Sequence, residues 1–193
     1  MNGVDASKIV GGNGKRRERD FYPTPPDATQ ALLNFVCPDL FYPKFENVWE
    51  PACGGGAIVN VLRENGIKTV GTDIQSGVDF LTADKPDVAI SWIITNPPFS
   101  LAEQFIRKAH NYLCKSGICF AFLLKSQYWH SKSRLALFRE CKPSYVLPLT
   151  WRPDFTGQGS SLMDMMWCVW TETRPSRTHY IPLERPKMES RQQ

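Results

Sequence analysis

The segment Asn96-Pro97-Pro98-Phe99 places two rigid hydrogen-bond acceptors at the end of the apolar stretch 88–95. Proline fixes φ and has no N–H, so the two prolines end the strand pattern and leave bare carbonyl groups. Asn96 offers a side-chain oxygen and Pro97 a carbonyl oxygen, and two acceptors aimed at one point suit the two hydrogens of an NH2 group. Phe99 adds a flat face on which a base can stack. The segment therefore predicts a site that binds and orients an amino group, with a purely structural role as the alternative.

A second motif, Glu50-Pro51-Ala52-Cys53-Gly54-Gly55-Gly56, lies between a short apolar stretch and a helical pattern. Glycine lets the backbone approach a ligand because no Cβ stands in the way. The motif lacks the G-x-G-x-x-G spacing, and no Gly-Lys followed by Ser or Thr is present, so it is not a P-loop. It indicates a ligand-binding turn, with a plain structural turn as the alternative.

Two acidic residues follow at positions that suit a bound nucleoside. Asp73 ends the next strand pattern, about 20 residues after the glycines, where an acid accepts hydrogen bonds from ribose hydroxyls. Asp79 and Phe80 stand in the segment 77–81, where the carboxylate is placed to accept an exocyclic amine and the ring to contact a purine. The alternative for this pair is a strand-edge turn with a core phenylalanine.

The elements that must position these residues alternate between strand and helix patterns. Pro26 begins the first helix, and Ser100 with Glu103 forms a capping box at the start of the third. We predict helices over 26–36, 57–65, 101–113 and 131–141, and strands over 47–50, 68–74, 78–81, 88–95, 117–124, 145–149 and 165–171. This order favours an α/β domain with a mostly parallel sheet, in which ligands bind at the carboxyl ends of the strands.

The termini differ from the middle in composition. Residues 1–20 are predicted to be a disordered basic arm, 21–173 the folded domain, and 174–193 a basic tail. The six cysteines form no C-x-x-C pair, so we expect reduced thiols and no metal site. The absence of a long apolar run and of a signal-peptide pattern predicts a cytoplasmic protein of a bacterial or phage-infected cell, without membrane contact.

In this order, the segments Phe-Tyr-Pro-Thr-Pro (21–25), 50–56, Asp73, 79–81 and 96–99 resemble the amino-group class of S-adenosylmethionine-dependent methyltransferases. They are similar in particular to small adenine-N6 DNA methyltransferases of phage and prophage type. The resemblance spans about residues 21–172. It implies a Rossmann-like class I methyltransferase fold, with a seven-stranded, mostly parallel sheet whose last strand, 165–171, is antiparallel.

The resemblance also implies roles for individual residues. Asn96, Pro97, Pro98 and Phe99 match the catalytic tetrad. The cofactor S-adenosyl-L-methionine would be bound by Tyr22, Thr24, Glu50, Ala52, Gly54, Gly56, Asp73, Ile74, Asp79 and Phe80, with Tyr22 and Thr24 at its methionine end.

Charge distribution indicates a polyanionic partner. The stretch 125–152 carries six basic residues against Glu140 alone, whereas the whole chain has a net charge of only +4. A solvated helix face is the alternative. The loop 150–164 is equally suited to substrate recognition and to an ordinary surface connection. Larger members of the family carry a target-recognition domain that is not visible here. The candidate nucleic-acid contacts are Lys125, Trp129, Lys132, Arg134, Arg152 and Phe155.

We therefore expect methyl transfer to N6 of adenine in DNA, by a monomer or weak dimer. RNA base methylation, at adenine N6 or guanine N2, is the nearest alternative. Protein-glutamine methyltransferases share a related tetrad but more often carry Tyr at the position of Phe99. A non-catalytic subunit that binds nucleic acid or a partner protein is the alternative from another class, although such subunits usually lose the glycine loop or the tetrad.

Overall fold

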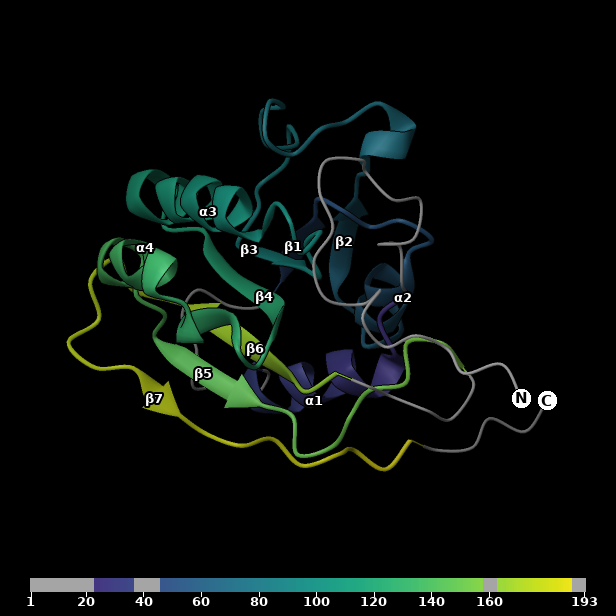
Figure 1. The fold of residues 1–193 in the computed structure, drawn as a ribbon. Coiled ribbons are helices and arrows are strands. Elements are labelled where there is room, and N and C mark those ends of the chain that lie inside the picture. The colour runs from purple at the N-terminus through teal and green to yellow at the C-terminus, as the bar shows by residue number, and fades with distance from the viewer. Residues whose placement is uncertain (1–22, 37–45, 158–162, 189–193) are drawn as a thin grey trace, which may run out of the picture.

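The computed structural model describes residues 23–36, 46–157 and 163–188, which form one seven-stranded sheet between two helical layers (Figure 1). The strands are β1 (Asn47–Glu50), β2 (Lys68–Gly71), β3 (Trp92–Thr95), β4 (Cys119–Lys125), β5 (Tyr145–Pro148), β6 (Met165–Trp170) and β7 (His179–Tyr180). The helices are α1 (Pro26–Val36), α2 (Ala57–Glu64), α3 (Ala102–Ser116) and α4 (Leu135–Glu140). Figure 1 shows α1 and α2 on one side of the sheet and α3 and α4 on the other.

The strand order is β2-β1-β3-β4-β6-β5-β7. Only β6 is antiparallel to its neighbours β4 and β5, and every other pair of adjacent strands is parallel. The predicted α/β class, seven-stranded sheet and antiparallel strand near 165–171 are therefore confirmed. Because β1, β2 and β3 are parallel neighbours, the segments that follow them emerge at one edge of the sheet, which brings Gly54, Asp73 and Asn96 together.

The core is built from strands that are buried on both faces. Every residue of β3 and β6 is buried, as expected for strands covered by helices on both sides. The indole N–H of Trp167 donates to the carbonyl of Ala28 at 2.8 Å, and that of Trp170 donates to the carbonyl of Cys141 at 2.8 Å. These bonds satisfy two buried donors and fix α1 and the end of α4 against the sheet.

The seven strands are not all the predicted ones. Residues 78–81 form a turn instead of a strand, in which Oδ1 of Asp79 accepts a hydrogen bond from the N–H of Leu81 at 3.0 Å. The seventh strand is β7, which lies in the segment predicted to be a tail and pairs with β5. Farther along, Leu183 is buried and its N–H donates to the carbonyl of Pro148 at 2.8 Å. The side chains of β7 are exposed, although the ring of His179 stacks on that of Tyr145 in β5, and no hydrophobic pattern in the sequence predicts the strand.

Two helix predictions also need correction. Ser100 does not cap α3, which begins after Leu101 without a side-chain cap, and the N–H of Leu101 instead donates to the carbonyl of Pro98 at 2.9 Å. The predicted helix 131–141 is α-helical only in α4, and two short 3-10 turns precede it. The predicted arm 1–20 lies outside the described residues, within which no helix is long and apolar enough to cross a membrane.

Candidate active site

The glycine motif forms the turn between β1 and α2. Gly54 and Gly56 have positive φ angles of 48° and 81°, which L side chains rarely adopt. The N–H of Gly56 donates to the carbonyl of Cys53 at 2.7 Å and closes the turn. These two glycines therefore shape the loop, whereas Ala52, Cys53 and Gly55 line the cavity beside it.

Asp73 follows β2 and fixes this turn from the side. Its Oδ2 accepts from the N–H of Gly54 at 2.9 Å and its Oδ1 accepts from the N–H of Gln75 at 2.8 Å. The side chain is largely buried and lines the cavity. Each oxygen of a carboxylate can accept a second bond, so Asp73 retains acceptor capacity toward a ligand.

Glu50 lies at the end of β1, under the first turn of α2. It is only 2 % exposed, and its Oε2 accepts from the N–H of Val59 at 3.0 Å. Burial raises the pKa of Glu50 to about 8, and the negative charge of Asp73 acts in the same direction, while the bond from Val59 opposes the rise. A cation bound nearby would favour the ionised form of this carboxyl.

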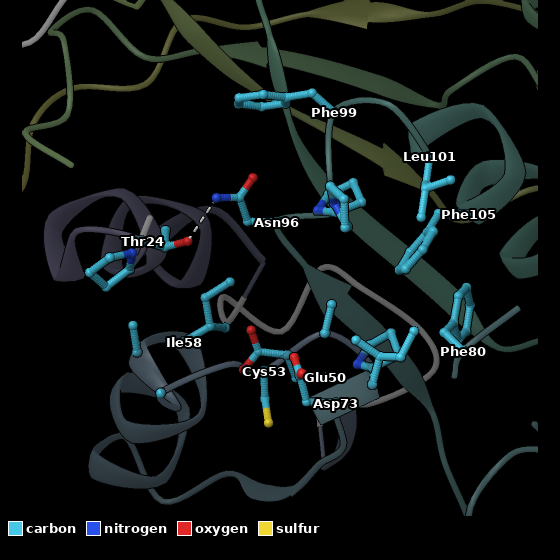
Figure 2. A pocket seen from close by; sticks show the side chains of 18 of the residues that line it. Thr24, Glu50, Cys53, Ile58, Asp73, Phe80, Asn96, Phe99, Leu101 and Phe105 are labelled. Carbon is cyan, nitrogen blue, oxygen red and sulfur yellow. Dashed lines mark hydrogen bonds between the residues drawn. The ribbon is translucent and has the colours of Figure 1, made fainter. Parts of the chain in front are cut away.

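The end of β3 presents the two acceptors that the tetrad predicts. Nδ2 of Asn96 donates to Oγ1 of Thr24 at 3.2 Å, as Figure 2 shows. Oδ1 of Asn96 is buried, and no hydrogen bond reaches it from the described residues. The carbonyl of Pro98 accepts from Leu101, whereas no described residue donates to the carbonyl of Pro97. A buried amide oxygen without a donor is costly, so this atom indicates a ligand donor.

Phe99 lies next to these acceptors with one face occupied. Nζ of Lys125, at the end of β4, lies 4.2 Å from the centre of the Phe99 ring, in cation–π geometry. A base that stacks on Phe99 would therefore use the other face of the ring. This contact places the charge of Lys125, one of the predicted nucleic-acid contacts, beside the tetrad.

One cavity of about 380 Å³ joins the separate motifs (Figure 2). Its wall includes the predicted residues Thr24, Glu50, Ala52, Asp73, Ile74, Asp79, Phe80, Asn96, Pro97, Pro98, Phe99 and Phe155. Of the predicted cofactor residues, Gly54 and Gly56 act through loop shape, and Tyr22 lies outside the described residues. The cavity is large enough for a nucleoside-sized ligand.

The opposite end of the cavity from Asn96 is apolar. Phe80 is almost fully buried, with its ring centre 5.2 Å from that of Trp49 and 4.7 Å from that of Phe105. Leu101 lies beside these rings in Figure 2. Sequence reasoning missed Ile58, Leu101, Phe105 and Met163 as wall residues. The four-residue spacing of Leu101 and Phe105 at the start of α3 was the signal available for two of them.

The wall carries three carboxyl side chains and no basic one. These are Glu50, Asp73 and Asp79, and none of the described wall residues is Lys, Arg or His. Such a cavity suits a cationic ligand that carries hydroxyl and amino donors, and it disfavours the phosphates of a dinucleotide. Among the residues that the structure describes, no group of three His, Cys, Asp or Glu side chains is placed to hold a metal ion.

The candidate nucleic-acid residues fall into different environments. Lys132 is exposed, and Phe155 is buried in the cavity wall. Arg152 is exposed and forms an ion pair with Asp164 at 2.8 Å.

Arg134 and Trp129 are engaged within the protein. The guanidinium of Arg134 lies 4.0 Å from the centre of the Tyr128 ring and donates to the Tyr128 carbonyl at 2.9 Å. The indole of Trp129 donates to Sγ of Cys168 at 3.3 Å and its ring packs edge-on against Phe138. The structure therefore gives Trp129 a packing role, which sequence position did not reveal.

The cysteines fit the expectation of free thiols in the described residues. Cys119, Cys141 and Cys168 are buried, Cys53 is half-buried in the cavity wall and Cys114 is exposed. Burial raises the pKa of the Cys53 thiol, and the negative charges of Glu50 and Asp73 raise it further, so this thiol is a weak nucleophile. Cys37 lies outside the described residues.

No family model and no curated protein sequence matches this chain. Solved structures do match in fold. A Listeria monocytogenes protein assigned to the class I S-adenosylmethionine-dependent methyltransferases has a TM-score of 0.59 at 14 % identity, covering 91 % of this chain and 68 % of that one. The methyltransferase subunit of a type I restriction-modification system from Streptococcus thermophilus has a TM-score of 0.58 at 13 % identity, covering 83 % and 47 %.

A third match is the M protein of the type I restriction enzyme EcoKI, with a TM-score of 0.55 at 13 % identity, covering 90 % of this chain and 51 % of that one. The chain thus spans about half the length of the two restriction-system subunits. At these identities the likeness shows the fold, which is that of the Rossmann-like class I methyltransferases.

Proposed function

We propose that this protein transfers a methyl group from S-adenosyl-L-methionine to the N6 amino group of adenine in DNA. The observation that carries the proposal is the buried Oδ1 of Asn96, to which no described residue donates. It lies on the wall of a cavity lined by carboxyl groups in a class I methyltransferase fold. The atom is an acceptor, no described residue donates to the neighbouring carbonyl of Pro97, and an aromatic ring follows at Phe99. This combination fits an NH2 group on a flat base.

The wall residues fit the proposed cofactor. S-adenosylmethionine is a nucleoside that carries a sulfonium cation and an ammonium group but no phosphate. Asp73 has spare acceptor capacity for the ribose hydroxyls, and the apolar end near Phe80 and Phe105 suits an adenine ring. Glu50 supplies a buried carboxyl whose charged form a nearby cation would favour. When bound, this cofactor supplies an electrophilic methyl group.

The tetrad can activate a weak nucleophile without a strong base. The lone pair of the adenine amino nitrogen is delocalised into the ring. If Oδ1 of Asn96 and the carbonyl of Pro97 accept its two N–H bonds, the nitrogen becomes more pyramidal and its lone pair turns toward the methyl group. Phe99 holds the base by stacking, and the fixed geometry lowers the barrier by alignment. The nitrogen would form a bond to the methyl carbon as the bond from that carbon to the sulfonium sulfur breaks, with its electron pair left on sulfur as a neutral thioether. The nitrogen would then lose one proton to water.

The proposal that DNA is the methyl acceptor is supported by a basic side chain and aromatic rings near residues 96–99. Lys125 adds a positive charge beside Phe99, in the stretch 125–152 that carries six basic residues against Glu140 alone. Phe155 adds a second aromatic ring to the cavity wall. Two of the structural neighbours are methyltransferase subunits of type I restriction systems. In duplex DNA the base must leave the stack to reach the tetrad, at a cost of a few kcal/mol.

The test is methyl transfer from labelled S-adenosylmethionine to four acceptors: unmethylated duplex DNA, single-stranded DNA, total RNA and a protein mixture. Label recovered as N6-methyladenine after digestion of the DNA supports the proposal. Label in RNA alone, or in glutamine, overturns the DNA assignment but retains methyl transfer. Failure to bind the cofactor in calorimetry overturns methyl transfer itself.

A further inference from the structure

The hydroxyl of Thr24 is the partner of the catalytic amide. Oγ1 of Thr24 accepts from Nδ2 of Asn96 at 3.2 Å, although 72 positions of sequence separate the two residues. Thr24 is 4 % exposed, and it lines the cavity on the side where Asn96 enters it (Figure 2). Among the described residues, no other hydrogen bond reaches the Asn96 side chain. Thr24 is therefore the contact that limits rotation of this amide.

The chain around Thr24 is stiff. Thr24 stands between Pro23 and the pair Pro25-Pro26, and a residue before proline is restricted to extended conformations. The carbonyl of Pro25 accepts from the N–H of Ala28 at 3.1 Å, which joins this segment directly to α1. A hydroxyl held on such a segment is a fixed point from which the Asn96 amide can be oriented.

The orientation decides whether the amide can do the proposed chemistry. With Nδ2 bound to Thr24, the acceptor Oδ1 remains for the amino group of the substrate. A rotated amide would present its own NH2 donor to the N–H bonds of the substrate, and two donors repel. In the arrangement that the structure shows, the Thr24 hydroxyl accepts from Nδ2 and so holds the amide in the orientation that leaves Oδ1 for the substrate.

We propose that Thr24 is a positioning residue of the transfer reaction, which acts through Asn96 and not through direct contact with the methyl acceptor. This inference rests on the proposed function, because it assigns Asn96 the role of binding the substrate amino group. It differs from the family-based expectation that Thr24 serves only the methionine end of the cofactor. The two roles predict different kinetic effects.

The decisive variant is Thr24→Val, which keeps the shape of the side chain and removes only the hydroxyl. We expect kcat on unmethylated DNA to fall on the order of 100-fold, as for other losses of alignment. The Kd for S-adenosylmethionine should stay within about threefold of the wild-type value. Thr24→Ser, which retains the hydroxyl, should recover most of kcat. If Thr24→Val does not fold, Thr24→Ala provides the same comparison with a smaller side chain.

A second measurement does not depend on enzyme activity. It records the two side-chain NH2 signals of Asn96 in a nitrogen–proton nuclear magnetic resonance spectrum, in which they are assigned by their loss in Asn96→Ala. We expect Thr24→Val to shift this pair and Thr24→Ser to leave it close to its wild-type position. Unchanged signals, an unchanged kcat, or a raised Kd for the cofactor with full kcat at saturation would overturn the inference. An inert wild-type protein would instead count against the proposed function, and the spectra would still decide the role of Thr24.

Discussion

The backbone N–H of Gly54 donates to Oδ2 of Asp73 at 2.9 Å, so a hydrogen bond connects the loop after β1 to the segment that follows β2. The N–H of Gln75 binds the other oxygen of the same carboxylate at 2.8 Å. One side chain therefore fixes the glycine turn and also lines the cavity with acceptor oxygens. We therefore expect a change at Asp73 to alter both the affinity for the cofactor and the shape of the glycine loop.

Asp73→Asn tests this double role. The substitution exchanges one oxygen for an NH2 donor, which must then face an N–H donor of either Gly54 or Gln75. We expect the Kd for S-adenosylmethionine, measured by calorimetry, to rise roughly 10- to 100-fold, in line with the loss of hydrogen bonds to a charged group. Asp87→Asn, at an exposed acid outside this cavity, is the control and should bind normally. Normal affinity in Asp73→Asn would contradict the assignment.

Asn96→Ala separates catalysis from cofactor binding. The change removes the buried acceptor Oδ1, so we expect kcat to fall roughly 100- to 1,000-fold, comparable to the loss of one preorganised hydrogen bond in other enzymes. The Kd for S-adenosylmethionine should change by no more than about threefold. Asn111→Ala on the exposed side of α3 is the matched control. Wild-type kcat in Asn96→Ala would refute the proposed mechanism.

The features that sequence predicts well are local. Pro26 and the apolar spacing after it predict α1 to the residue, and the glycine motif predicts the turn before α2. Asp73 and Asn96 were expected at strand ends, and the parallel sheet brings both to one cavity. Each of these predictions depends on a signal contained within a few neighbouring residues.

The features that sequence does not predict depend on contacts between distant segments. The bond from Asn96 to Thr24 and the burial of Phe155 in the cavity wall arise only after the chain has folded. β7 carries exposed side chains and is held by backbone bonds to β5, which leave no pattern in the sequence. Asp79 was expected within a short strand over 78–81, but its carboxylate accepts a hydrogen bond that closes a tight turn instead.

Glu50→Gln should make the protein more stable at neutral and alkaline pH. Burial raises the pKa of Glu50 from 4.5 in its unperturbed state to about 8, so the folded state binds more protons than the unfolded state between these values. The stability contributed by this group is complete below about pH 4.5 and is lost as pH rises through about 8. Gln removes the ionisation and retains an acceptor oxygen for the N–H of Val59.

The measurement is the melting temperature of wild type and Glu50→Gln from pH 4.5 to pH 9, without ligand. The melting temperature of the variant should exceed that of wild type by an amount that grows as the pH rises from 4.5 to about 8. The corresponding difference in the free energy of unfolding should reach the order of a few kcal/mol. Glu172→Gln, at an exposed position, should show no such trend. A constant difference between Glu50→Gln and wild type at all pH values would show that Glu50 is not buried in the way described.

Lys125→Met tests whether the charge beside the tetrad serves the acceptor. Nζ of Lys125 lies over the ring of Phe99, which lines a cavity whose described wall carries carboxyl groups and no basic side chain. Methionine keeps a long flexible chain over the ring but removes the charge, so stacking on Phe99 is preserved while attraction to a phosphate is lost. We expect a higher KM for DNA and a Kd for S-adenosylmethionine close to that of wild type.

Salt dependence gives the sharper result. If Lys125 contacts one phosphate, the slope of log affinity for DNA against log salt should fall by about 1 in Lys125→Met. Lys115→Met removes an equal charge at an exposed position in the last turn of α3 and should leave the slope unchanged. Equal slopes in wild type and Lys125→Met, together with a reduced kcat, would mean that Lys125 acts only on Phe99. The DNA surface would then have to be sought among the exposed basic residues Lys132, Arg139 and Arg152.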